Sequence, residues 1–339
     1  MTTSGFVKSA GALCALAIIS ACGSGSAVPS STTGFSAAYI GKTLFVNGRP
    51  VTAARVAPAP SYAQLVPDAK AKDYEYIIND YGSYASIFDY PKSTKMLGKI
   101  NNVGGQGCTN VQFGYGKKII WIVAGPTQIQ EYQVPNKLLN TLSVNYSFAS
   151  SCAMDTEGDL AVGILYGSGR NGGGGGDVVI FKKGSTKGTA YATPLDEEFF
   201  DGYDPQGDLF ADGFTGSRSG FALVELPKGS SKFVTIATSN RPNFPGSVQW
   251  DGTYMTVFDQ TTNETYQYTI SGTNATLKNT VTLSGSSDCA QTWLVKGLLY
   301  CGDAGNNGGE VFKYPAGGSP VATLTGSFDF PLGVTVAKR

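Results

Sequence analysis

The chain contains no histidine among its 339 residues. This absence excludes catalytic triads that depend on a histidine base and removes the commonest metal ligand. Charged residues make up only 15% of the chain and the formal net charge is zero, so the composition predicts no nucleic-acid partner. There is also no long helical pattern. An enzyme built on this sequence would have to use carboxylates, Tyr, Lys or a carboxylate-bound metal.

Glycine is abundant instead, with 45 residues, as many tight turns require. Short strand-like runs alternate with turn signals, most clearly over Gly207–Gly252. A closing glycine recurs every 42 to 49 residues, at Gly116, Gly158, Gly207, Gly252 and Gly297. A second turn signal recurs six times, at Tyr90-Pro91, Val134-Pro135, Lys183-Gly184, Pro227-Lys228-Gly229, Ser271-Gly272 and Tyr314-Pro315. A period of about 40–45 residues with four strands is typical of a β-propeller blade, so we expect an all-β, six-bladed propeller.

The phase of the repeat predicts how the ring closes. Blade-like sequence starts at Tyr74 with a run that matches second strands of later repeats. It ends with FPLGVTVAK, which matches first strands. We therefore expect Val334 and Val336 to pair with the strand at Tyr76–Asn79, so that the C-terminal strand completes the first blade and removes two open edges.

These repeats resemble NHL-type six-bladed propellers, an architecture that gluconolactonase-like proteins share. The turns YPAGG at Tyr314–Gly318 and the run FPLGVTVA are more closely similar to those of secreted or lipid-anchored bacterial propellers. The resemblance covers about residues 74–339 and implies a fold without an activity. The absence of histidine departs from streptogramin lyase-like propellers, whose chemistry uses one.

The first 22 residues have the pattern of an export signal. Lys8 precedes a short apolar run, Ser9–Ile19, which is too short to span a bilayer. The following Ile19-Ser20-Ala21-Cys22 resembles a bacterial lipobox, which implies that Cys22 is lipidated after cleavage. Gly23 follows it, which by resemblance implies no retention at the inner membrane. We expect residues 23–71 to form a Ser/Pro/Ala-rich tether with a small hairpin at Asn47-Gly48, ahead of the propeller at 74–339. The protein should thus be exported and anchored by its lipid to the cell envelope.

Aspartates end the second strands of four repeats: Asp80, Asp212, Asp259 and Asp303. One interpretation is a partial ring of carboxylates that holds Ca²⁺. The favoured alternative is that each carboxylate accepts hydrogen bonds from backbone amides of its own loop. No residue is assigned as a metal ligand or as catalytic.

Other unusual residues are expected on the same face of the disc, where the loops after second strands and before first strands open. An acidic segment, Asp196–Asp204, is assigned to a loop before a first strand and includes Asp201. A glycine-rich insertion, Gly172–Gly176, lacks the ending of a phosphate loop. It lies beside Arg170, and Arg218 occupies the equivalent loop of the next repeat. The ligand-contact candidates are Arg170, Asp201, Asp212, Arg218, Asp259 and Asp303.

Four cysteines lie outside the signal, and an even number in an exported chain predicts disulfides. Cys108 and Cys152 precede closing glycines of adjacent repeats by similar distances, which favours a bond near the axis. Cys289 and Cys301 flank the hairpin at Lys296-Gly297 but are three residues out of register, so their bond requires a β-bulge.

Three functions are compatible with these features. The favoured one is a binding module whose loop face docks a small ligand, a glycan or a partner protein. The alternatives are a divalent-metal-dependent hydrolase of the lactonase type and a structural envelope protein. The missing histidine and the lack of a catalytic constellation favour binding.

Overall fold

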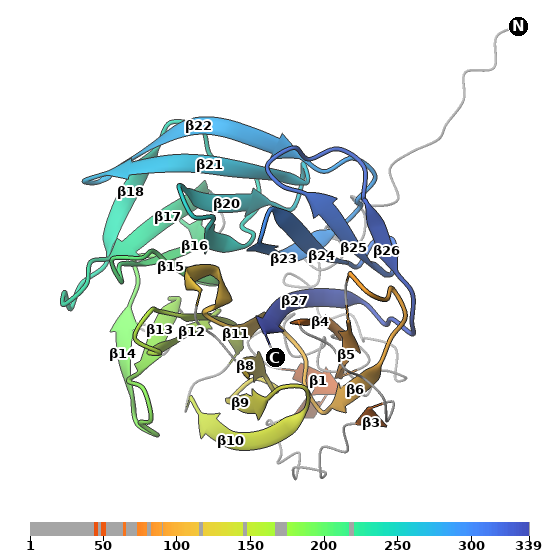
Figure 1. Ribbon diagram of the computed structural model, residues 1–339. Coiled ribbons are helices and arrows are strands. Elements are labelled where there is room, and N and C mark those ends of the chain that lie inside the picture. Colours follow the sequence, from red (N-terminus) through yellow and green to blue (C-terminus); the bar gives the residue numbers. More distant parts are fainter. Residues whose placement is uncertain are drawn as a thin grey trace, which may run out of the picture.

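The computed structural model describes residues 44–46, 49–51, 64–65, 73–79, 83–89, 91–114, 118–144, 148–166, 175–216 and 220–338. Within these ranges the chain is all-β, apart from one 3-10 turn, η2 (Val111–Phe113). Four-stranded antiparallel units stand around a common centre in a propeller-like arrangement, with their first strands near the centre (Figure 1).

Three of these units are separate four-stranded sheets. Their strands are, in order, β7 (Gly107–Cys108), β8 (Ile119–Val123), β9 (Gln128–Gln133) and β10 (Lys137–Ser143); β11 (Ala149–Met154), β12 (Leu160–Ile164), β13 (Asp177–Phe181) and β14 (Gly188–Ala192); and β23 (Cys289–Val295), β24 (Leu298–Asp303), β25 (Gly308–Lys313) and β26 (Ala322–Leu324).

An eight-stranded sheet holds two further units, joined where their last strands run parallel. The first unit is β15 (Glu197–Tyr203), β16 (Leu209–Thr215), β17 (Gly220–Leu226) and β18 (Val234–Thr238), and the second is β19 (Val248–Trp250), β20 (Met255–Asp259), β21 (Glu264–Ser271) and β22 (Asn274–Thr282). The junction is short: Ala237 lies opposite Asn274 and Thr238 opposite Ala275.

The remaining sheet contains the two ends of the propeller. Its order is β27 (Pro331–Lys338), β4 (Asp73–Asn79), β5 (Tyr84–Phe88), β6 (Gly98–Asn101) and β3 (Gln64–Leu65). Val334 lies opposite Ile77 and Val336 opposite Glu75, so the expected pairing of the C-terminal strand is confirmed. Earlier in the chain, β1 (Leu44–Val46) pairs with β2 (Arg49–Val51) on either side of Asn47-Gly48. The pairing of β3 with β6 shows that part of the segment expected as a tether adds to a sheet.

The turns fall where the repeat predicts them. Gly158, Gly207, Gly252 and Gly297 each lie between a first and a second strand, with φ between 74° and 106°. This left-handed region strongly favours glycine, which explains why glycine marks these positions in the sequence. The second set of turn signals falls between third and fourth strands, as in β25–β26.

Four of the first strands share one irregularity near their beginning. The pairing register shifts between Ala149 and Ser151 in β11, between Glu198 and Phe200 in β15, between Cys289 and Thr292 in β23, and between Pro331 and Gly333 in β27. Each shift is a β-bulge, which changes the face on which the following side chains lie. The packed core fills the spaces between neighbouring sheets; its largest cluster runs from Ile77 through Trp293 to Cys152 and Val162.

Candidate functional site

One face of the disc, the loop face, carries the connections that follow second strands and those that precede first strands. Five aromatic side chains gather there and form what we call the aromatic cluster: Phe148, Tyr166, Phe199, Phe214 and Phe244. Phe148 precedes β11, Tyr166 follows β12, and Phe244 lies in the connection before β19. Three neighbouring units therefore contribute to one surface.

The rings of the aromatic cluster pack edge to face. Ring centroids are 5.5 Å apart for Phe199 and Phe214, 5.6 Å for Phe199 and Phe244, and 5.2 Å for Phe214 and Phe244. Phe148 and Tyr166 pair at 5.7 Å, and Phe199 packs against the buried group that these two residues form with Leu165. Phe199 and Phe244 stay partly exposed to solvent, while the other three are buried. Edge-to-face packing fixes the relative orientation of the rings, so the cluster is a rigid apolar surface.

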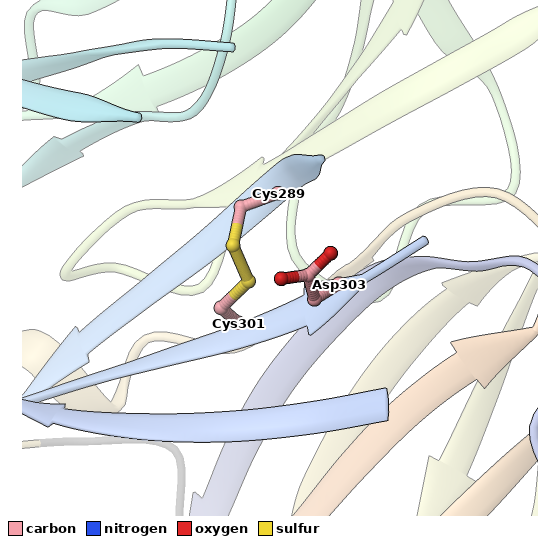
Figure 2. Close-up of side chains that lie close together, drawn as sticks. All are labelled: Cys289, Cys301 and Asp303. Carbon is pink, nitrogen blue, oxygen red and sulfur yellow. A yellow bond between two sulfur atoms is a disulfide. The ribbon is translucent and has the colours of Figure 1, made fainter. Parts of the chain in front are cut away.

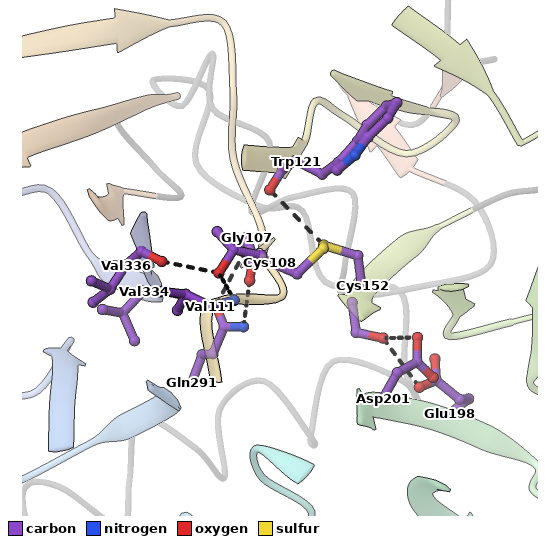
Figure 3. Close-up of a disulfide and its surroundings, with 12 residues drawn as sticks. Gly107, Cys108, Val111, Trp121, Cys152, Glu198, Asp201, Gln291, Val334 and Val336 are labelled. Carbon is purple, nitrogen blue, oxygen red and sulfur yellow. Dashed lines mark hydrogen bonds between the residues drawn. A yellow bond between two sulfur atoms is a disulfide. The ribbon is translucent and has the colours of Figure 1, made fainter. Parts of the chain in front are cut away.

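Phe199 is flanked in β15 by buried carboxyl groups. Glu198 has 0% and Asp201 6% of its surface exposed, and Asp212 of the adjacent β16 has 0%. We call these three residues the acid group. Figure 3 shows Glu198 and Asp201 side by side, near the Cys108–Cys152 disulfide.

Two serines of β11 bind the acid group from the neighbouring sheet. The Ser151 hydroxyl lies 3.2 Å from Glu198 Oε1 and 3.0 Å from Asp201 Oδ2. Ser150 Oγ lies 3.1 Å from Glu198 Oε2 and 3.2 Å from the Gly163 carbonyl oxygen. Gly163 is required by this packing, because a Cβ there would lie 2.1 Å from Glu198 Oε2.

Burial dominates the ionisation of these acids. It raises the pKa of Glu198 well above its usual range, and the negative charge of Asp201 and a hydrogen bond to it raise that pKa further. The pKa of Asp201 is raised to about 6 by burial, against the lowering effect of hydrogen bonds from Glu198 and Ser151. Burial also raises the pKa of Asp212 well above its usual range. Since the hydrogen bond favours protonated Glu198 and ionised Asp201, Glu198 donates and Asp201 accepts.

The structure corrects the assignment of Asp196–Asp204 to a loop. Glu197–Tyr203 is the first strand β15 itself, and Asp201 lies inside the protein rather than on the loop surface. Asp201 faces the interior together with Glu198 because of the bulge between Glu198 and Phe200. In a regular strand, two residues three positions apart, such as Glu198 and Asp201, lie on opposite faces. The residue inserted by the bulge brings both carboxyls to the same face.

The aspartates at second-strand positions accept hydrogen bonds from nearby backbone amides, as the favoured interpretation predicts. Asp259, also fully buried, accepts hydrogen bonds from the Asn243 amide group and backbone and from the backbone of Phe244 and Thr261. Asp212 accepts from the Gly246 backbone at 3.1 Å. Asp303 accepts from the backbone of residues 287, 288 and 306. Among the described residues, the groups whose ligand atoms lie close enough for a metal ion do not bring these three aspartates together.

The described residues contain two disulfides. Cys108 of β7 and Cys152 of β11 join two first strands, with Cα atoms 5.6 Å apart. Cys289 and Cys301 join β23 to β24 (Figure 2). Thr292 lies opposite Cys301, but Cys289 lies opposite Asp303, so the bulge that this second bond requires is there.

Two groups in the described residues have ligand atoms close enough together for a metal ion. One is Cys289, Cys301 and Asp303, whose sulfurs are engaged in the disulfide. The other is Asp155, Glu157 and Asp159, on the face opposite the loop face. Lys182 lies 2.6 Å from Asp159, and Lys228 lies 2.6 Å from Glu157, so two of the three carboxylates in this second group are already paired with lysines.

Several predicted residues lie outside the described residues, namely Cys22, Asp80, Arg170 and Arg218. Conversely, sequence reasoning singled out Glu198 only as part of the acidic segment Asp196–Asp204, and it gave no role to the two serines or to the aromatic cluster. One signal for the cluster was available, because phenylalanine recurs just before or at the start of first strands, at Phe148, Phe199, Phe244 and Phe330.

No family model matches the sequence, and no curated protein matches it. Among solved structures, the fold is similar to a chain in a crystal structure of a nidogen/laminin complex, with a TM-score of 0.59 and 11% sequence identity. The match covers 78% of this chain and 98% of that one. At this identity the likeness shows the fold alone. The described ranges contain no helix with the length and apolar character that a membrane span requires.

Proposed function

We propose that this protein is a six-bladed, NHL-like β-propeller, exported and lipid-anchored through Cys22, that binds a partner protein through its loop face. The blade count follows from treating the eight-stranded sheet as two blades that share an outer junction, β18 with β22. Together with the three separate sheets and the sheet closed by β27, this makes six.

The aromatic cluster is the observation that carries the binding proposal. Its rings come from strands and loops of three units and are fixed by mutual packing, so the surface exists before any partner arrives. Asp259 accepts a hydrogen bond from the backbone N–H of Phe244, which helps to hold this residue in place. A preorganised aromatic surface loses little conformational entropy on binding, and aromatic side chains are enriched among residues that dominate protein interfaces.

A partner protein fits this surface better than a sugar. Sugars stack on open ring faces, whereas these rings direct their edges onto each other's faces. The partly exposed Phe199 and Phe244 offer apolar contact area of the kind found at the centre of protein interfaces. The similarity to a chain from a nidogen/laminin complex adds support at the level of fold.

The lactonase alternative has less support. Such an enzyme requires carboxylates that reach substrate or a substrate-bound metal. Glu198 and Asp212 are fully buried, and Asp303 is saturated by amide donors. These three carboxyls are buried and do not face an open site.

Site-specific photo-crosslinking in cells tests the proposal. A photoreactive amino acid replaces Phe244 in the aromatic cluster or, as a control, Val234, which is exposed on the outer strand β18. We expect one discrete protein adduct from position 244 and none from position 234. Equal adducts from both positions, or an adduct to glycan at position 244, would contradict a partner protein at the loop face.

A further inference from the structure

Neighbouring first strands are joined mainly by contacts that do not titrate. Gln291 of β23 accepts from the backbone of Val334 at 2.8 Å and of Gly107 at 3.2 Å (Figure 3). Gln249 of β19 exchanges hydrogen bonds with the backbone of Leu294. Thr109, just after β7, donates to the carbonyl of Val336 at 3.0 Å, and the Cys108–Cys152 disulfide joins β7 to β11. Amide, hydroxyl and disulfide groups keep the same form across the neutral pH range.

The junction between β11 and β15 is different. Its side-chain hydrogen bonds run from Ser150 and Ser151 to the carboxyls of Glu198 and Asp201, and the Ser151 hydroxyl lies within hydrogen-bond distance of both carboxyls. On its other side, β11 is covalently held to β7 through Cys152, the residue after Ser151. Loss of the carboxyl contacts would therefore loosen β11 from β15 and leave the attachment of β11 to β7 intact.

We propose that the contact between β11 and β15 is a pH-sensitive latch, closed while Glu198 and Asp201 share a proton and loosened when both carboxyls are ionised. Two carboxylates in a buried site with no cation repel each other and lose their mutual hydrogen bond. The Ser151 hydroxyl has one hydrogen and can donate to only one of them at a time.

The groups that face the latch reinforce this behaviour. Across the junction, β11 presents only the two serine hydroxyls, and β12 presents Gly163. From β16, Asp212 adds a third carboxyl, whose charge would oppose ionisation of Glu198. Tyr203, further along β15, is buried and neutral. None of the ion pairs among the described residues includes a member of the acid group.

The sign of the pH effect follows from which state holds more protons. In the unfolded chain these acids ionise near pH 4. The folded protein keeps its protons to higher pH, because burial raises the pKa of Asp201 to about 6 and that of Glu198 further above its usual range. The contribution of these two groups to stability is therefore greatest at acidic pH and is lost as pH rises through this window. Each extra proton in the folded state raises the unfolding equilibrium constant about tenfold per pH unit.

Urea unfolding of the full chain between pH 5 and pH 8 tests the latch, with Glu198→Gln as the variant. The glutamine amide can still donate to Asp201 but cannot ionise, so the slope of log K for unfolding against pH should decrease by up to one proton. Glu157→Gln, a surface control, should keep the wild-type slope. An unchanged slope in Glu198→Gln would overturn the proposal.

Hydrogen exchange of the wild-type protein provides a second readout that does not depend on any variant folding. After correction for intrinsic rates, protection of amides in β11 and β15 should fall between pH 6 and pH 8 by about tenfold or more relative to amides in β23. A uniform change in all three strands would show global destabilisation and contradict a local latch.

Discussion

Val334 of β27 lies opposite Ile77 of β4, and both side chains are fully buried. The last strand of the chain is therefore the innermost strand of the sheet that contains the first repeat. Because the two residues are 257 positions apart (334 − 77), this single strand joins the beginning and end of the propeller. We expect a contact so distant in sequence to make folding of the whole ring cooperative.

Removal of this strand should abolish cooperative folding. Deletion of residues 328–339 would expose the edge of β4 that pairs with β27. It would also expose core residues that β27 covers, including Ile77. We expect a chain without a sharp melting transition by circular dichroism. Val321→Ala, a control at an exposed position, should melt close to the wild type. A truncated protein that melts near the intact temperature would contradict the role of β27 in closing the ring.

The two disulfides should contribute unequally to stability. Cys108 and Cys152 are 44 residues apart and Cys289 and Cys301 only 12. Chain entropy gives the longer loop about 4 kcal/mol and the shorter about 3 kcal/mol. The double variant Cys108→Ser/Cys152→Ser should therefore be less stable than Cys289→Ser/Cys301→Ser by about 1 kcal/mol in denaturant titrations. The reverse order would show that local packing around Cys289 outweighs loop length.

Replacement of Glu75 by glutamine should stabilise the protein at neutral and alkaline pH. Both carboxylate oxygens are buried without a hydrogen-bond partner, and burial raises the pKa of this group well above its usual range. The folded state holds a proton that the unfolded chain loses above about pH 4, so wild-type stability falls as pH rises. In urea titrations the gain for Glu75→Gln should be small at pH 4.5 and reach about 1–3 kcal/mol at pH 8. A gain that does not depend on pH would contradict this explanation.

Asp259 should be essential for the loop that carries Phe244. Its carboxylate accepts four hydrogen bonds, from Asn243 twice, from Phe244 and from Thr261. Asp259→Ala removes the buried acceptor of these four bonds, and we expect a loss of about 3 kcal/mol in the free energy of unfolding. The exposed Glu157→Ala should cost less than about 1 kcal/mol, as surface ion pairs do. If Asp259→Ala is as stable as wild type but alters ligand binding, the carboxylate contacts ligand after all.

Lipidation of Cys22 remains a prediction. Mass spectrometry of the membrane-extracted protein should find an acylated N-terminal Cys22. Cys22→Ser should leave the precursor uncleaved by the lipoprotein signal peptidase. An unmodified N-terminus at another residue would contradict the anchor.

The amino-acid sequence by itself determined the repeat and its phase. Glycine at left-handed turn positions such as Gly158 and Gly207 is a local requirement of the backbone, so it is visible in the sequence. The phase of the repeat placed the C-terminal strand beside β4, and strand alternation required a bulge for the Cys289–Cys301 bond. These features depend on neighbours close in sequence or on a repeat that can be counted.

Only the tertiary structure decided which side chains meet between the sheets. The bulge at Phe199 brings Glu198 and Asp201 to one face, and a one-residue shift of this kind leaves no reliable mark in a pattern with a period of two. The partners of these acids, Ser150 and Ser151, come from a different sheet, as do the rings that surround Phe199. Burial changes the ionisation of the acids only once those sheets have packed, because desolvation is a property of the assembled interior.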